Sequence, residues 1–159
     1  MTFNYRFASE DPAPLLLRLK VEVNTREHFS ARGLRRVPFA VDFRWFTGRC
    51  DINTYDLDEL LGTKLRALYQ RRKGRDLFDT ATALAREDVD PMRVVSAVGR
   101  YMEEAGHRVT RAEFERNLLA KIEDRRFVMD LPPLLASGQD WDVAEAATLL
   151  LEKVGPQLP

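Results

Sequence analysis

Lys64 and Arg71 are the residues of this 159-residue chain whose types and spacing most directly suggest chemistry. They lie in residues 55–79, where the sequence predicts one helix, a break and the start of a second helix. The spacing of three and four residues that gives a helix one apolar stripe is kept by Leu57, Leu60, Leu61, Leu65 and Leu68. Turning each residue by about 100° places both cations on this stripe. A buried cation without a partner is costly, so we expect each to meet an anion, either a carboxylate of the fold or a bound phosphate.

Simpler explanations of the same cations remain open. Lys64 can extend its side chain past the leucines to water, and Arg71, close to Gly74, has the weaker claim to burial. The neighbouring cations Arg66, Arg72 and Lys73 are expected to be solvated.

The ends of the two helices have their own signals. Asp56 is expected to cap the first helix, and with Glu59 three residues later it approximates a capping box in which Asp replaces Ser or Thr. Gly74 is expected to end or break this helix. The second helix is expected over residues 76–86, where Asp76 can be the N-cap and Asp79 an acid of the first turn. This structural use is an alternative to a functional one, and the two are compatible because Asp79 can also pair with Arg75.

Two motifs in this sequence resemble the AbiEii/AbiGii-type nucleotidyltransferases, the toxins of bacterial type IV toxin–antitoxin and abortive-infection systems. The first is Lys64, Ala67, Arg71, Arg75-Asp76, an aromatic residue and Asp79, which resembles the third motif of the family, with Phe78 where the family often has Tyr and Thr80 where it often has Leu. The second is residues 19–24 followed by Arg26-Glu27, which resembles the strand that carries a lysine and a metal-binding carboxylate.

The resemblance implies a role for each matching residue. Glu22 is implied as a metal-side carboxylate or catalytic base, and Lys20 as a group near the acceptor. Lys64 and Arg71 are implied to contact nucleotide phosphates, while Arg75, Asp76 and Asp79 hold the motif together. The implied cofactors are a nucleoside triphosphate with Mg²⁺, and the implied partners are an RNA acceptor, such as a tRNA 3′ end, and a cognate antitoxin. The residues alone allow another explanation, in which Lys20 and Glu22 are an ion pair on a solvated strand face.

One family motif is missing from the sequence. A Gly-Ser turn followed by a strand with Asp-x-Asp should precede Glu22, and no residues there fit it. We therefore expect the C-terminal portion of a nucleotidyltransferase, from a truncated or split reading frame, that is inactive alone. Without upstream strands its sheet should have an uncovered edge, which favours self-association or an upstream fragment as partner.

The composition fits a folded protein of one ordinary domain. Apolar residues make up 45% and charged residues 31%, and the formal net charge is zero, which argues against a general nucleic-acid binder. Cys50 is the single cysteine and is expected in a strand. We find no signal peptide and no apolar run of the roughly 20 residues that span a membrane, so the cytoplasm is the expected location.

Alternating side chains predict the remaining elements of an α+β fold. Residues 4–7 and 15–24 should form an antiparallel hairpin, and residues 38–45 and 50–54 a second one around a turn at Thr47-Gly48. Later helices are expected over residues 91–104, 110–124 and 141–154, with a capping box from Thr110 to Glu113 and a break at Pro132-Pro133. His28 and His107 are expected to be a surface residue and a helix C-terminal residue, not ligands. The predicted domains are a partial nucleotidyltransferase sheet over residues 1–55 and a helical bundle over residues 56–159.

A different class of function stays open. A noncatalytic helical module could bind RNA or a protein through the basic segment around Lys64. It predicts an exposed Lys64, salt-dependent binding and no role for Glu22, whereas the enzyme hypothesis predicts a recessed Lys64 facing Glu22.

Overall fold

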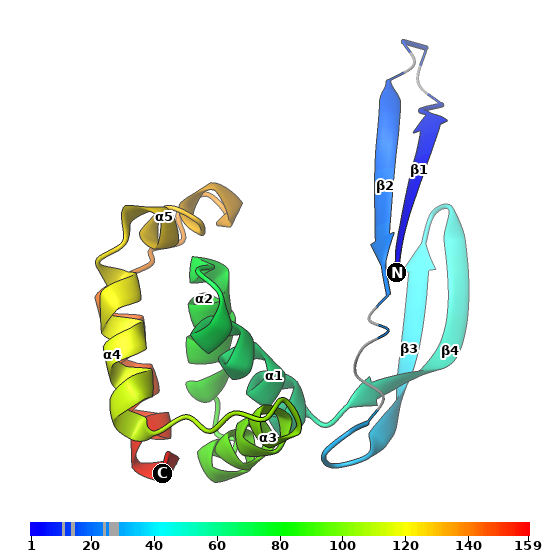
Figure 1. The fold of residues 1–159 in the computed structure, drawn as a ribbon. Helices are drawn as coiled ribbons and strands as arrows, with labels where there is room; N and C mark the ends of the chain where they lie inside the picture. Colours follow the sequence, from blue (N-terminus) through cyan, green and yellow to red (C-terminus); the bar gives the residue numbers. More distant parts are fainter. Residues whose placement is uncertain (11, 14, 24, 26–28) are drawn as a thin grey trace. The chain divides into compact units, whose positions relative to one another are not determined.

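The computed structural model describes residues 1–10, 12, 13, 15–23, 25 and 29–159. Asn24, Arg26, Glu27 and His28, which entered the sequence predictions, lie outside the described residues. The chain divides into two compact units, residues 1–30 and residues 31–159. The predicted α+β class is confirmed, since two small antiparallel sheets precede a set of helices (Figure 1).

The first unit contains one β-hairpin. Strand β1 (Thr2–Ala8) pairs with β2 (Leu16–Glu22), as predicted. Phe3, Tyr5 and Phe7 lie opposite Val21, Leu19 and Leu17, so one face of the hairpin is apolar. The other face carries Arg6 opposite Arg18 and Asn4 opposite Lys20, which makes it basic.

The second unit begins with a longer hairpin, β3 (Leu34–Phe43) and β4 (Phe46–Tyr55). Its turn falls at Arg44-Trp45, so the predicted turn at Thr47-Gly48 is wrong. Gly48 instead lies within β4, where the ring of Phe46 comes within 2.8 Å of the place that a Cβ on Gly48 would occupy. The missing side chain of Gly48 therefore makes room for the Phe46 ring, and Gly48 is not a turn residue. Cys50 lies in β4, as expected, and is exposed.

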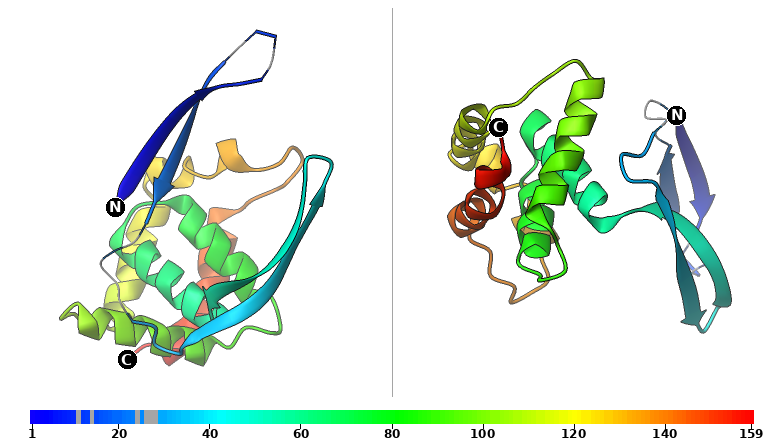
Figure 2. Two further views of the ribbon diagram at one scale, coloured as in Figure 1. Left: turned by 90° about the vertical axis from the view of Figure 1, so that its right-hand side faces the viewer. Right: turned by 90° about the horizontal axis from the view of Figure 1, so that it is seen from below.

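Six α-helices follow in the part of the chain that the structure describes. Their bounds are α1 (Leu57–Gln70), α2 (Gly74–Leu84), α3 (Pro91–Glu104), α4 (Arg111–Ile122), α5 (Arg125–Val128) and α6 (Val143–Val154), with single 3₁₀ turns at Pro132–Leu134 and Gly155–Gln157. α1 packs against α2 and α3, and α6 packs against α2 and α4 (Figure 2). Buried Leu65, Leu77, Val94, Phe114 and Leu150 belong to the core that these helices share.

Several helix ends agree with the sequence. Asp56 caps α1 through the backbone N–H of Asp58, and Thr110 and Glu113 form the predicted capping box of α4. α3 has the predicted bounds, and it is followed after its C-cap Ala105 by Gly106, whose φ of 73° suits a glycine. The backbone N–H of His107 then donates to the carbonyl of Met102, which completes a Schellman C-cap.

The start of α2 differs from the prediction. α2 begins at Gly74 with Lys73 as N-cap, so Asp76 is not the cap but the third residue of the helix, and Asp79 lies beyond the first turn. Gly74 does not end α1, which stops at Gln70. A Cβ on Gly74 would clash with the backbone carbonyl of Phe127, so this glycine lets α2 start close against α5.

Candidate phosphate-binding cluster

The apolar stripe of α1 is narrower than the sequence suggested. Leu61, Leu65 and Leu68 are buried, but Leu57 and Leu60 are 37% and 40% exposed. Lys64 lies one turn beyond Leu60, so it occupies the border of the buried stripe and not its centre. Its side chain is 36% exposed. This exposure lies between the recessed Lys64 of the enzyme hypothesis and the exposed Lys64 of the noncatalytic binding module.

Carboxylates of α2 bind both predicted cations of α1. The Lys64 ammonium donates to Asp79 at 2.8 Å and lies 3.9 Å from Asp76. Arg71, the residue that follows α1, donates from Nε and Nη2 to the two oxygens of Asp76 at 2.6 and 2.7 Å. The expectation that each cation meets an anion is therefore confirmed, and in this structure the anion is a carboxylate of the fold.

Asp76 is the centre of this cluster, which comprises Lys64, Arg71, Asp76 and Asp79. Its side chain is fully buried and is shared by the two cations. The hydrogen bonds that Arg71 donates to Asp76 are the main cause that raises the pKa of Arg71 above its ordinary value. Lys64 and Arg71 remain 36% and 52% exposed, so both keep surface for a further anion.

Thr80 and Phe78, the two residues that differ from the usual family motif, each have a partner within the fold. Thr80 is fully buried, and its hydroxyl donates to the backbone carbonyl of Asp76 at 2.7 Å, so no polar atom is left unpaired there. Phe78 packs edge to face on Trp141, with ring centroids 5.1 Å apart.

A second layer of contacts holds the turn between α1 and α2. Lys73 pairs with Asp130 at 3.1 Å, Arg72 pairs with Asp124 at 2.8 Å, and the backbone N–H of Arg75 donates to Asp130 at 3.5 Å. Burial is the largest single influence and would raise the pKa of Asp130, but the hydrogen bonds and charges of Lys73 and Arg75 together leave that pKa below its ordinary value. The possible pairing of Arg75 with Asp79 is not the one seen, since Asp79 contacts Lys64.

Lys121 of α4 is a member of this region that the sequence did not indicate. Its ammonium is buried and donates to the carbonyl of Leu68, and to that of Tyr69 at 2.7 Å, so it caps the C-terminal end of α1 just before Arg71. Burial is the main cause that lowers the pKa of Lys121 to about 8. More than 50 residues separate Lys121 from the carbonyls that it caps, so no local pattern could reveal the contact.

Acidic residues at the other end of α1 anchor the start of β3. The buried carboxylate of Glu59 accepts hydrogen bonds from the backbone N–H groups of Ala31 and Arg32 and from the hydroxyl of Tyr101. Glu59 was expected to act in a capping box, and its carboxylate has this set of partners instead. Asp56, beside it, pairs with Arg35 at 2.8 Å.

Lys20 and Glu22 lie in the first unit, on the basic face of the β1–β2 hairpin. They pair at 2.7 Å and both are more than half exposed. The hydrogen bond and charge of Lys20 hold the pKa of Glu22 below its ordinary value. Whether Glu22 faces Lys64 stays a prediction.

The described residues do not fit a magnesium site by themselves. No three His, Cys, Asp or Glu side chains among them come together as metal ligands. Glu22 is a single carboxylate whose nearby charge is a lysine, whereas Mg²⁺ is bound through carboxylates and phosphates.

Comparison with known families finds a family model that spans both motif regions. The family model for the nucleotidyl transferase AbiEii toxin of type IV toxin–antitoxin systems matches residues 1–149. The chain belongs to the AbiEii family. No curated protein and no solved structure gave a match. The Lys64–Asp79 cluster and the Lys20–Glu22 pair both lie within the matched part of this AbiEii chain, and among its described residues no helix is long and apolar enough to cross a membrane.

Proposed function

We propose that this AbiEii chain binds the phosphates of a nucleoside triphosphate and presents them for transfer to an RNA acceptor such as a tRNA 3′ end. The observation that carries the proposal is the sharing of buried Asp76 by Lys64 and Arg71. A shared carboxylate fixes two cations beside each other before any ligand arrives. Such preorganised cations can bind the charge that develops on phosphate during transfer.

The two cations bind phosphate in different ways. Arg71 uses Nε and Nη2 for Asp76, which leaves its second terminal nitrogen for a phosphate oxygen. The ammonium of Lys64 is a compact charge with three N–H donors. Asp79 accepts a hydrogen bond from one of them. Asp76 and Asp79 act as positioning residues in this scheme, and Arg75 adds positive charge at the start of α2.

The acceptor side is assigned to the β1–β2 hairpin. Arg6 and Arg18 are directly opposed and Lys20 lies on the same face, an arrangement of like charges that an anion would stabilise. An RNA backbone supplies such anions. Glu22 is placed at the end of this basic face as the candidate base for the attacking hydroxyl.

We further propose that the chain transfers little or no nucleotide by itself. Among the described residues no three His, Cys, Asp or Glu side chains come together as metal ligands, and Glu22 is a single carboxylate paired with Lys20. The complete reaction therefore needs metal-binding carboxylates that these residues do not supply. We place the reaction in the cytoplasm, where triphosphates and tRNA are available. A cognate antitoxin would limit this activity.

Triphosphate binding is the experiment that tests the proposal. The purified chain is titrated with ATP, GTP, CTP and UTP, with and without Mg²⁺, and compared with Lys64→Ala and with the control Lys153→Ala, which removes an exposed lysine from α6. We expect binding that Lys64→Ala weakens about tenfold, the change for a lost charge-assisted contact, and that Lys153→Ala leaves unchanged. Equal loss in both variants would indicate nonspecific charge attraction and favour the noncatalytic binding module.

A second assay tests inactivity. The chain is incubated with Mg²⁺, each radiolabelled triphosphate and total tRNA, and labelled tRNA is measured. Detectable transfer by the purified chain would contradict the proposal that it is inactive alone, without affecting the assignment of the phosphate-binding residues.

A further inference from the structure

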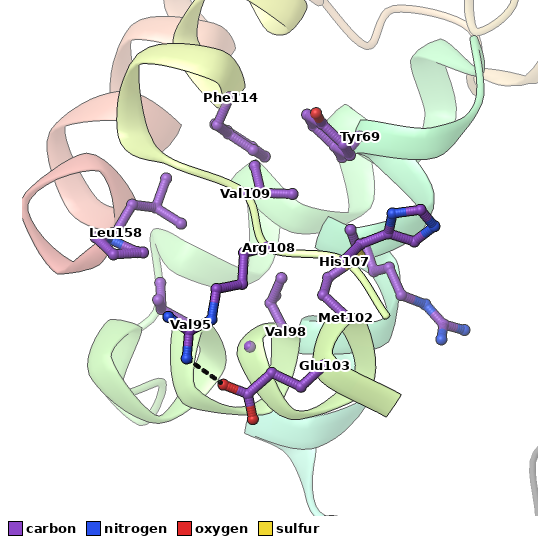
Figure 3. Close-up of a pocket in the computed structure, with 13 residues that line it drawn as sticks. Tyr69, Val95, Val98, Met102, Glu103, His107, Arg108, Val109, Phe114 and Leu158 are labelled. Atoms are coloured by element: carbon purple, nitrogen blue, oxygen red, sulfur yellow. Dashed lines mark ion pairs between the residues drawn. The ribbon is translucent and has the colours of Figure 1, made fainter. Parts of the chain in front are cut away.

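The second unit contains a pocket that shares no lining residue with the Lys64–Asp79 cluster. It has a volume of about 300 Å³ and lies between α1, α3, α4 and the C-terminal residues (Figure 3). Its apolar lining includes Tyr69, Val95, Val98, Met102, Phe114 and Leu158. A volume of this order with mainly apolar walls is typical of a small-molecule site.

Gly99 keeps the open side of the pocket free of a side chain. It lies inside α3, where glycine is less favourable than alanine. Packing explains Gly62, another helical glycine, because a Cβ there would come within 2.7 Å of the side chain of Ala97. At Gly99, which is exposed, nothing apart from its chain neighbours and the backbone of α3 lies within 4 Å of such a Cβ. Gly99 therefore lines an open side of the pocket, where it adds no side chain of its own.

Charged residues stand at the rim of the pocket. Figure 3 shows Arg108, His107 and Glu103 on the segment where α3 ends, with Arg108 and Glu103 joined as an ion pair. This pair is loose at 3.9 Å, and the Arg108 side chain is 88% exposed. Arg66 also lines the pocket, so basic side chains outnumber the single carboxylate of Glu103.

We propose that this pocket binds a small molecule with an apolar body and one anionic group. The apolar body lies over Gly99 against Val98, Met102 and Phe114. The anionic group lies at the rim beside Arg108, where it competes with Glu103. This site is independent of the proposed triphosphate site, since the two share no residue.

Three probes with the same eight-carbon body test both parts of the proposal. Octanoate, octan-1-ol and octylammonium are titrated into the full chain below micelle formation, and backbone amide shifts locate the binding. We expect shifts at Gly99, Met102 and Val109, with octanoate about two- to fivefold tighter than octan-1-ol, as for an exposed ion pair, and octylammonium weakest. Equal affinity of the three probes would overturn the anionic class, and shifts confined to other residues would overturn the site.

Substitutions separate this pocket from other apolar surface. Gly99→Leu places a side chain in the open space, and we expect octanoate binding to weaken about tenfold or more. Ser96→Leu adds the same side chain at an exposed position of α3 outside the pocket and should leave binding unchanged. Arg108→Gln should remove the preference for octanoate over octan-1-ol. Unchanged binding to folded Gly99→Leu would contradict the proposal, and if that variant does not fold, the shifts in the unsubstituted chain decide.

Discussion

At the scale of single residues, burial decides which carboxylate of the cluster matters for stability. Asp76 and Asp79 both contact Lys64, but Asp76 is fully buried and Asp79 is 42% exposed. We expect Asp76→Asn to lower the free energy of unfolding by about 2 kcal/mol, because Arg71 loses a bidentate partner in a buried setting. Asp79→Asn should cost less than about 1 kcal/mol. Urea unfolding of the two variants measures the difference, and a larger effect at Asp79 would contradict it.

The buried ammonium of Lys121 gives stability a specific dependence on pH. Its pKa falls from 10.5 to about 8 in the folded chain, so between these values the unfolded chain binds more protons. Stability of the unsubstituted chain should therefore rise with pH from about 8 to 10.5, relative to Lys121→Met. Unfolding measured across this range, with Lys153→Met as the control, tests the slope. A parallel pH dependence in all three chains would show that Lys121 keeps an ordinary pKa.

At the scale of elements, two helical glycines predict opposite effects of the same substitution. Gly74→Ala places a Cβ against the carbonyl of Phe127, where α2 starts beside α5, and should destabilise the chain by about 1–3 kcal/mol. Gly99→Ala meets no described atom and improves helix propensity, so it should stabilise α3 by about 0.5–1 kcal/mol. Thermal unfolding compares the two variants. Destabilisation by Gly99→Ala would mean that the residue is a glycine for a reason other than open space.

At the scale of the whole molecule, the β1–β2 hairpin predicts association. Its six apolar-face side chains, Phe3, Tyr5, Phe7, Leu17, Leu19 and Val21, are each at least 38% exposed. Isolated two-stranded hairpins are marginally stable in water. Burial of this apolar face against another chain would therefore stabilise the hairpin. We expect concentration-dependent self-association in sedimentation velocity, weakened by Leu19→Lys and not by Asn4→Lys on the opposite face. A monodisperse monomer at all concentrations would contradict this expectation.

The sequence alone determined features that depend on local spacing. Alternation predicted the β1–β2 hairpin and its two faces. The spacing of Thr110 and Glu113 predicted the capping box of α4, because neighbours along the chain satisfy these hydrogen bonds. The family motifs were also local patterns, and the family that they indicated is confirmed by the match over residues 1–149. Even the need of Lys64 and Arg71 for an anion followed from their place beside leucines.

Tertiary structure decided what depends on contacts between distant segments. Gly74 suggested a helix end, but the close approach of the backbone of Phe127 accounts for it. Asp76 was a candidate N-cap, yet packing of α1 on α2 buries it between two cations. Lys121 and the pocket beside Gly99 had no local signal at all. Each arises where helices far apart in the sequence meet, because packing and not local propensity determines which polar groups are buried and which space stays open.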